Sequence, residues 1–347
     1  MKFYTTSKKL KKNIENFYKV FLYRSYKNIN KEDTFVGWGR KKSGLEAIKL
    51  AKKYSAKFLL LEDGFLRSLS LGIENSPSFS IIKDNVGVYY DATAPSKLEN
   101  ILNTHEFSFE ELEQAKKAIE LIKKEKLSKY NNNLHIPKEL FSANEERVLI
   151  ITQVANDASL KFGLADKFST QEIINDAIKE NPNAKIYIKI HPDVLSSKKQ
   201  SDFNAQDLSS RCVILKENYN PIELLSHFKK VYTKTSGMGF EALMLGQECV
   251  CYGVPFYAGW GLTHDLHEIP RRTRVLSLEE LVAGVLILYP RYIHPKSKNL
   301  CEVEFALDIM LKMQKDYFSK FYLRWFMNIR IYILRKIRRL IEFILDR

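Results

Sequence analysis

Residues 56–64, AKFLLLEDG, form a continuous apolar run that closes on two acids and a glycine. Such a run is typical of a strand that is buried on both faces of a parallel sheet. Short apolar strands are also predicted at 34–39 and 86–91. Apolar residues at helical spacing predict helices at 43–55 and 95–103. The first part of the chain therefore alternates between strands and helices.

The same pattern returns after residues 130–146, a polar and turn-rich segment in which we place a domain linker. A long charged helix is predicted just before it, at 108–128. Beyond the linker, the sequence predicts strands at 147–152, 185–190, 212–215, 230–233 and 248–253, and helices at 170–179, 221–228, 239–245 and 277–289. Two successive runs indicate an α/β fold with two Rossmann-like domains, in which ligands bind at the carboxyl ends of the strands.

The 347-residue chain carries a net charge of +14, which favours an anionic partner. Residues 1–31 hold nine basic residues and one acid, and residues 315–347 hold nine basic residues and three acids. The middle of the chain is therefore close to neutral, which argues against a nucleic-acid groove across the body. We divide the chain into a basic amphipathic segment at 1–31, Rossmann-like domains at 32–142 and 145–305, and C-terminal helices at 306–347.

The tail between residues 318 and 344 places aromatic and aliphatic residues three to four apart, with basic residues tending to the other side. This pattern is typical of a helix on an anionic bilayer surface; packing on the protein or on a second subunit is the alternative. No window reaches the roughly 20 apolar residues of a membrane span, and no signal peptide is recognised. With no paired cysteine motif either, we expect a cytoplasmic protein, peripheral on the inner face of the cytoplasmic membrane.

Three motifs that can carry chemistry fall where predicted strands end. The first is the acid pair Glu62 and Asp63, followed by Gly64 and Arg67. A carboxylate at a strand end can serve as a general base toward an incoming hydroxyl. A solvated turn would give the same pattern.

The second motif is His-Pro-Asp at 191–193. Because proline stops the strand, the imidazole of His191 is expected at the carboxyl end of that strand, in a cleft between the two domains. There it can donate to a phosphate oxygen. The third motif, KTSGMGFEAL at 234–243, places Thr235, Ser236 and Gly237 before an apolar helix. Hydroxyls and backbone N–H groups at a helix N-terminus form an anion site, with a ligand-free capping turn as the alternative.

Longer stretches repeat a known pattern: GWGRK (37–41), LEDGFLRSLSLG (61–72), YYDATAPSKLE (89–99), TQVANDAS (152–159), IKIHPDVL (188–195), TSGMGFEAL (235–243), YGVPFYAGWGLTHD (252–265) and YPRYIHP (289–295). They resemble the KpsC/KpsS-type capsule polysaccharide proteins, a family that contains retaining β-Kdo transferases built as paired Rossmann domains of the GT-B type. The resemblance covers roughly residues 34–305. KpsC carries two such modules, whereas this chain has one.

The resemblance implies CMP-β-Kdo as the donor and Asp157, in the loop after the strand at 147–152, as the catalytic aspartate. A retaining reaction needs a carboxylate on the face of the sugar opposite the leaving group. Gln153 and Asn156 are expected to orient this carboxylate. The stretch FYAGWGLTHD, at 256–265, is expected to close over the donor or to stack on its base, with a packed turn as the alternative.

One group of residues is expected around the CMP phosphate: His191, Lys189, Thr235, Ser236 and Gly237. Glu241 is expected to meet the ribose or the cytosine. Glu62 or Asp63 would face the acceptor or help to deprotonate it. Arg67 or Arg40 would pair with the Kdo carboxylate in a bidentate fork.

The partners implied by the resemblance are CMP-Kdo, a lipid-linked or Kdo-terminated saccharide acceptor, and capsule or lipopolysaccharide assembly proteins. No cofactor and no metal are expected, since the donor has a single phosphate and the chain has no DxD motif. Nucleic acid is not expected as a partner. Two other functions are weighed: an inverting transferase of the CMP-sialic acid type, and a non-catalytic scaffold in a capsule assembly complex.

Overall fold

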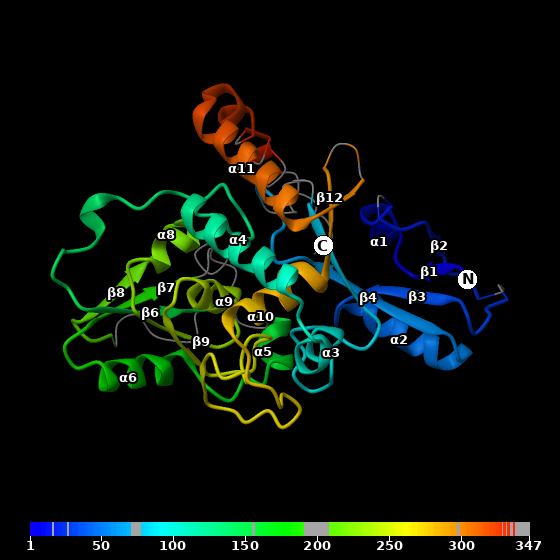
Figure 1. Ribbon diagram of the computed structural model, residues 1–347, viewed down its shortest axis with the longest axis horizontal. Coiled ribbons are helices and arrows are strands. Elements are labelled where there is room, and N and C mark those ends of the chain that lie inside the picture. The colour runs from blue at the N-terminus through cyan, green and yellow to red at the C-terminus, as the bar shows by residue number, and fades with distance from the viewer. Residues whose placement is uncertain are drawn as a thin grey trace.

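The computed structural model describes residues 1–15, 17–25, 28–70, 78–154, 157–190, 208–295, 297, 299–327, 329–330, 332–333 and 336. Two sheets lie toward opposite ends of the molecule, with helices packed around them and between them (Figure 1). The sequence-based expectation of an α/β fold with two Rossmann-like domains is confirmed.

The first sheet is mixed, with seven strands in the order β13-β12-β5-β4-β3-β1-β2. Its strands are β1 (Phe3–Thr5), β2 (Val20–Leu22), β3 (Thr34–Trp38), β4 (Lys57–Asp63), β5 (Ser80–Asp84), β12 (Pro290–Ile293) and β13 (Leu300–Cys301). Its helices are α1 (Lys8–Asn13), α2 (Lys42–Tyr54), α3 (Lys97–Thr104) and α4 (Phe109–Glu125). Strands β1 to β4 pair in parallel, whereas β5, β12 and β13 join by antiparallel pairing.

The N-terminal segment that was expected to lie apart from the domains is part of the first sheet. β1 pairs with both β2 and β3, and the side chains of Leu10 and Ile14 are buried. Strands of three residues are too short to leave a recognisable alternation in the sequence. The helical spacing of the apolar residues therefore dominated the prediction for residues 1–31.

The strand predicted at 86–91 is wrong, because the observed strand β5 ends at Asp84 and turns follow it. The carboxylate of Asp84 accepts hydrogen bonds from the backbone N–H groups of Val86 and Gly87, each at 2.8 Å. These donors are therefore taken by a side chain and are not available to a sheet.

The chain also returns to the first sheet late in the sequence. β12 pairs with β5, with Arg291 opposite Ile81, so the predicted domain at 145–305 includes two strands that belong to the other sheet. Pairing between residues this far apart in sequence leaves no local signal, which explains the difference.

The second sheet has six strands, all parallel, in the order β11-β10-β9-β6-β7-β8. Its strands are β6 (Arg147–Ile151), β7 (Lys185–Lys189), β8 (Cys212–Leu215), β9 (Lys230–Thr233), β10 (Glu248–Cys251) and β11 (His264–Asp265). Its helices are α5 (Ala158–Phe162), α6 (Thr170–Glu180), α8 (Pro221–Leu225) and α9 (Gly237–Met244). Because β6 lies between β7 and β9, the strand order reverses beside β6, which places the topological switch point between β6 and β9.

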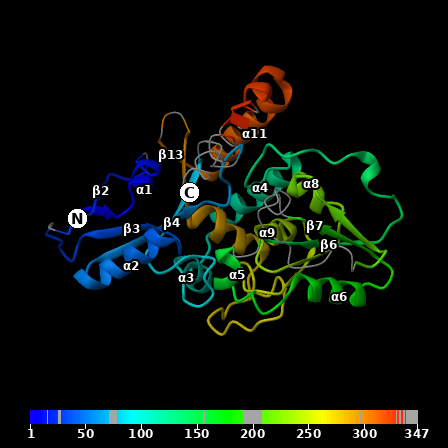
Figure 2. The same ribbon diagram turned by 180° about the vertical axis from the view of Figure 1, so that it is seen from behind.

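One hydrophobic cluster runs through both domains and joins Phe79 and Ile82 to Leu149 and Val231. Helix α4 packs against α10 (Leu278–Val282), the π-helix η4 (Ala283–Leu288) and α11 (Val303–Ser319). Seen from behind, α4 lies in the region between the two sheets, and α11 projects outward from it (Figure 2). The linker region carries the short 3-10 helix η2 (Lys138–Leu140) and isolated β-bridges at Tyr130 and Leu134.

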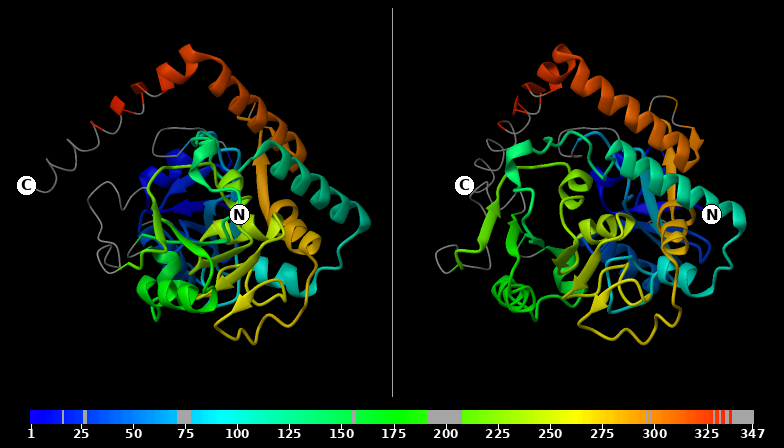
Figure 3. Two further views of the ribbon diagram at one scale, coloured as in Figure 1. Left: turned by 90° about the vertical axis from the view of Figure 1, so that its left-hand side faces the viewer. Right: turned by 60° about the vertical axis from the view of Figure 1, so that its left-hand side comes forward.

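Beyond α11, which lies beside α4 in Figure 3, helical residues continue at 321–327. The large apolar side chains of this tail are exposed: Phe321, Tyr322, Trp325, Phe326, Ile329, Tyr332 and Ile333. The expected alternative in which this face packs on the chain itself is therefore wrong for these residues. Within the described part of the chain, the helices are too short or too polar to cross a membrane.

Candidate active site

The loops that follow β6 and β9 meet at the switch point of the second sheet. The side-chain oxygen Oε1 of Gln153 accepts a hydrogen bond from the backbone N–H of Thr235 at 2.7 Å, and Nε2 of Gln153 donates to Oγ1 of Thr235 at 2.9 Å. Two residues predicted to serve the site therefore hold each other in place. In doubly wound sheets this position is where ligands bind.

Ser159 of α5 completes this contact. Its Oγ lies 3.1 Å from Nε2 of Gln153 and 3.2 Å from Oγ1 of Thr235. Glycines allow the close approach: a Cβ added at Gly163 or at Gly253 would lie 2.6 or 2.8 Å from Cγ2 of Thr235. Helix α5 is thus fixed against the loop after β9 by hydrogen bonds and by contact. We call Gln153, Ser159 and Thr235 the switch-point network.

Asp157 is the N-cap residue of α5, and its Oδ1 accepts a hydrogen bond from the backbone N–H of Ser159 at 2.9 Å. The residue is exposed to solvent. The predicted catalytic carboxylate is therefore linked to the switch-point network through its hydrogen bond with Ser159.

The N-terminus of α9 offers an anion site beside this network. Ser236 is its N-cap and accepts a hydrogen bond from the backbone N–H of Met238 at 3.3 Å. A Cβ added at Gly237 would meet no atom within 4 Å, so space lies in front of the helix. Tyr257 Oη donates to the carbonyl oxygen of Ser236 at 2.6 Å and fixes the turn from the other side. The N–H groups of Ser236, Met238 and Gly239 already donate to acceptors within this turn. A phosphate would therefore be attracted chiefly by the helix dipole and the N–H of Gly237.

Lys189 ends β7 and is buried, and burial lowers the pKa of its ammonium group. Glu241 of α9 accepts a hydrogen bond from Oγ of Ser128, and burial raises the pKa of Glu241 to about 7. Glu241 therefore joins α9 to the segment that follows α4. Its expected contact with a ribose or a cytosine stays a prediction.

Glu62 and Asp63 end β4 in the first domain. Trp38 Nε1 donates to Oε1 of Glu62 at 2.7 Å. Burial, and then the charge of Asp63, raise the pKa of Glu62 to about 7. Gly39, at a φ of +39°, leaves room for this carboxylate, because a Cβ there would lie 2.7 Å from Oε2 of Glu62. Asp63 pairs instead with Arg67, at 2.8 Å.

Arg40 pairs with the buried carboxylate of Asp91, and its guanidinium lies 5.6 Å from the ring centroid of Phe162 in α5. The first domain thus contacts the helix that begins at Asp157. Arg40 and Arg67 both have carboxylate partners within the chain. Their expected pairing with a sugar carboxylate would require sharing or exchange of these partners.

Two predicted residues, Asn156 and His191, lie outside the described residues. Among the residues that are described, the structure holds no cluster of three or more histidine, cysteine or acidic side chains that could hold a metal ion. The expectations about metal and cofactor stay predictions.

Sequence reasoning missed Ser159, Trp38 and Asp91 as parts of the site. Each lies inside a stretch that carried the family resemblance, so a signal was present. Their roles depend on contacts with distant segments, which the stretches by themselves do not show.

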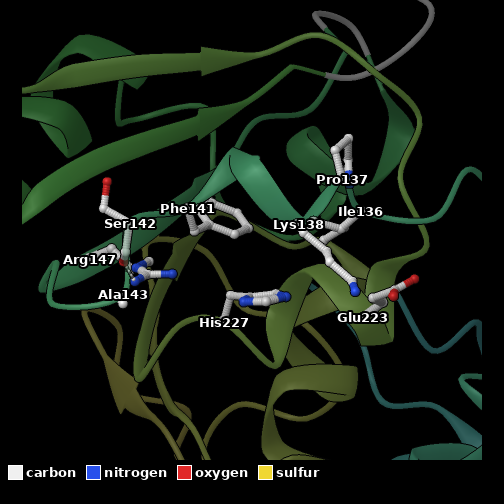
Figure 4. A pocket seen from close by; sticks show the side chains of 9 residues that line it. All are labelled: Ile136, Pro137, Lys138, Phe141, Ser142, Ala143, Arg147, Glu223 and His227. Carbon is white, nitrogen blue, oxygen red and sulfur yellow. Dashed lines mark hydrogen bonds between the residues drawn. The ribbon is translucent and has the colours of Figure 1, made fainter.

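A cavity of about 390 Å³ lies away from these residues, beside the linker. Its walls come from the linker, the start of β6 and the region of α8, and Figure 4 shows Phe141 next to His227, with their ring centroids 4.7 Å apart. None of the predicted site residues lines it. We therefore place the candidate active site at the switch point and not in this cavity.

Two Rossmann-like domains, with polar side chains gathered at strand ends between them, define the chain as a protein of GT-B type fold. A model of the family "Capsule polysaccharide biosynthesis protein" matches residues 33–292. The chain belongs to this family.

Solved structures extend the likeness to nearly the whole chain. "Thermosulfurimonas dismutans KpsC, beta Kdo 2,4 transferase" is 39% identical with a TM-score of 0.83, covering 90% of this chain and 98% of that one. "Thermosulfurimonas dismutans KpsC, beta Kdo 2,7 transferase" is 33% identical with a TM-score of 0.72, covering 91% and 100%.

Curated relatives are longer than this chain. The capsule polysaccharide modification protein LipA of Neisseria meningitidis serogroup B is 40% identical over 83% of this chain, but the match spans only 42% of LipA. The lipopolysaccharide-processing protein LpsZ of Rhizobium meliloti is 38% identical, over 81% of this chain and 64% of LpsZ.

Proposed function

We propose that this protein is a glycosyltransferase that moves Kdo from CMP-β-Kdo to a saccharide or glycolipid acceptor with retention of configuration. The reaction would serve capsule or lipopolysaccharide biosynthesis. Family membership supports the pathway, and the two KpsC structures, whose names state β-Kdo transfer, support the reaction.

One observation carries the proposal. The switch-point network fixes the helix that begins at Asp157 against the turn that begins α9. The carboxylate of Asp157 and the turn that we propose as the phosphate site are thereby held on neighbouring loops of one sheet edge. This is the arrangement that a sugar with a single activating phosphate needs, because the nucleophile and the leaving group act on one carbon.

In the first step, an oxygen of Asp157 would bond to the anomeric carbon of Kdo while the bond from that carbon to the CMP phosphate oxygen breaks. CMP leaves with the electron pair as an anion, received by the N-terminus of α9 with Lys189, and with His191 as expected from the sequence. A single phosphate can be stabilised by these groups, so we propose that the reaction needs neither metal nor cofactor.

In the second step, the acceptor hydroxyl would attack the same carbon and release the carboxylate of Asp157. Glu62 would accept the hydroxyl proton. Its pKa of about 7 suits this task, because a base near neutrality is both deprotonated and able to hold a proton. Two displacements at one carbon restore the starting configuration.

The test is incubation of the purified chain with CMP-Kdo, generated in situ, and a panel of Kdo-terminated acceptors, with products identified by NMR. A β-linked Kdo product is expected, together with released CMP. An α-linked product would favour an inverting mechanism. Binding of CMP without turnover on any acceptor would favour a scaffold.

We also propose that the tail binds an anionic membrane surface on the inner face of the cytoplasmic membrane. The seven exposed apolar side chains between Phe321 and Ile333, which we call the aromatic stripe, follow helical spacing. Lys320, Arg324 and Arg330 supply positive charge around it. Helix α11 anchors the tail, because Met310 and other side chains of α11 are buried.

The test uses vesicles with phosphatidylglycerol and vesicles of phosphatidylcholine alone. Replacing Phe321, Trp325 and Phe326 by serine is expected to weaken sedimentation with anionic vesicles by at least about 100-fold, since each buried aromatic contributes roughly 1.5–3 kcal/mol. The matched control is Phe109→Ser, at an equally exposed site on α4. Unchanged vesicle binding would refute the proposal, and so would a change confined to oligomeric state, which would assign the stripe to a second copy.

A further inference from the structure

A buried acid of the first domain holds two arginines of the second. Glu99 lies in the first turn of α3 and is almost fully buried. Its Oε1 is 2.8 Å from Nε of Arg271, and its Oε2 is 3.2 Å from Nε of Arg272. Asn103, one turn further along α3, contacts the backbone on both sides of Arg272. Its Nδ2 donates to the carbonyl of Arg271 at 2.7 Å, and its Oδ1 accepts from the N–H of Thr273 at 3.1 Å.

Besides Glu99, the side chain of Arg272 contacts the loop that follows β10. Its Nη1 donates to the carbonyl of Pro255 at 2.7 Å and also to that of Ala258. Its guanidinium lies 5.5 Å from the ring centroid of Trp260. Tyr257 lies between Pro255 and Ala258 in the sequence, and its hydroxyl donates to the carbonyl oxygen of Ser236. A continuous set of contacts therefore leads from Glu99 to the cap of α9.

Arg271 reaches the other half of the site. Its Nη2 donates to the carbonyl of Ala92 at 2.8 Å, and the N–H of Ala92 donates to the carbonyl of Phe162 at 2.8 Å. Phe162 is the last residue of α5, the helix that Asp157 caps. Figures 1 and 2 both place α3 beside α5.

We propose that Glu99, Arg271 and Arg272 form a clamp that positions the two halves of the active site relative to each other. The proposal rests on the proposed function for the site that it serves. A buried carboxylate with two guanidinium partners tolerates little movement, because separation leaves a charge buried without its partner. The clamp therefore fixes the first domain, the 254–261 loop and α5 in one arrangement. Its members are positioning residues, since they act through Tyr257 and Phe162 and not on the substrate.

The first test is hydrogen–deuterium exchange without ligand. Glu99→Gln, which keeps the shape of the side chain and removes its charge, is expected to speed exchange in residues 254–261 and 158–162 by about ten-fold or more. Arg271→Gln leaves the contact between Glu99 and Arg272 in place, so it is expected to speed exchange mainly in residues 158–162. This variant replaces Glu99→Gln as the test if Glu99→Gln does not fold. Glu280→Gln is the matched control, because Glu280 pairs with Arg274 in the same region at 3.0 Å but takes no part in the clamp.

The second test adds CMP and measures transfer. CMP is expected to slow exchange in α3 of the wild-type protein but not of Glu99→Gln, since coupling between two sites is reciprocal. For transfer, Glu99→Gln is expected to lower kcat about ten-fold or more with KM for the donor changed less than about three-fold, because misplacement by about 1 Å slows reaction strongly.

If Glu99→Gln lowers the melting temperature but leaves kcat unchanged, the clamp stabilises the fold without positioning the active site, and the proposal is wrong. Equal exchange in Glu99→Gln and in the wild-type protein would refute it outright. If CMP protects no segment of the wild-type protein, the proposed function fails, and the ligand-free exchange still decides on the clamp.

Discussion

The two sheets supply the candidate site in unequal measure. In the second sheet every strand runs in the same direction, so the carboxyl ends of β6, β7 and β9 all lie at one edge. In the first sheet β5 runs against β4, and predicted site residues follow only the carboxyl ends of β3 and β4. Under the proposed function, the parallel sheet would supply the phosphate site and the nucleophile. The mixed sheet contributes a few side chains, chiefly the acid Glu62.

The largest effect is expected in the second domain. Asp157→Ala should lower transfer by at least about 1,000-fold, because removal of a nucleophile leaves only binding and electrostatic contributions. Affinity for CMP, measured by calorimetry, should stay within about three-fold, since the phosphate site keeps its own donors. Asp166→Ala is the control, at an exposed aspartate just beyond α5. Transfer by Asp157→Ala at the wild-type rate would remove this residue from the reaction.

A smaller effect is expected in the first domain. Glu62→Gln keeps the contact with Trp38 and should lower transfer about 100-fold, the usual contribution of a general base. In the wild-type protein the rate should rise with pH through about 7, because the carboxylate with the raised pKa accepts a proton only when it is ionised. The variant should lose this rise.

Glu32→Gln, in an exposed ion pair of the same domain, is the control for this pH profile. A rise near pH 7 that persists in Glu62→Gln would assign the titration to another group.

The smallest effect is expected within the switch-point network. Thr235→Val keeps the methyl group against Gly163 but loses the hydroxyl that meets Gln153 and Ser159. Affinity for CMP should fall about ten-fold, corresponding to one hydrogen bond of roughly 1.4 kcal/mol. Thr104→Val, at an exposed helix end, should leave the affinity unchanged. An unaltered affinity in Thr235→Val would mean that the network does not shape the phosphate site.

The second domain was predicted well because its strands are apolar and separated by clear turns. The strands expected at 147–152, 185–190 and 230–233 are observed as β6, β7 and β9. The first domain was predicted less well because it depends on short strands and on distant pairing, as in β1 and β12. The strand predicted at 86–91 is replaced by turns that the side chain of Asp84 caps, whereas β5 at Ser80–Asp84 was not predicted.

Within the site, sequence reasoning named the ends of the strands correctly but not their mutual contacts. Gln153 and Thr235 were both expected to serve the site, yet their hydrogen bond arises only from the strand order of the folded sheet. The contact of Glu241 with a nucleotide stays a prediction, and its hydrogen bond to Ser128, a residue more than a hundred positions earlier, was not foreseen. The helical position of Glu241 gave no hint of this partner.

The late return of β12 to the first sheet has a consequence for synthesis on the ribosome. The partner of β5 is made only after the whole of the second sheet, so the backbone groups along that edge of β5 wait for translation of residues 290–293. An open strand edge recruits other chains. A truncated chain that ends just before Pro290 should therefore aggregate or depend on chaperones, whereas one that ends after Cys301 has the strand that covers this edge.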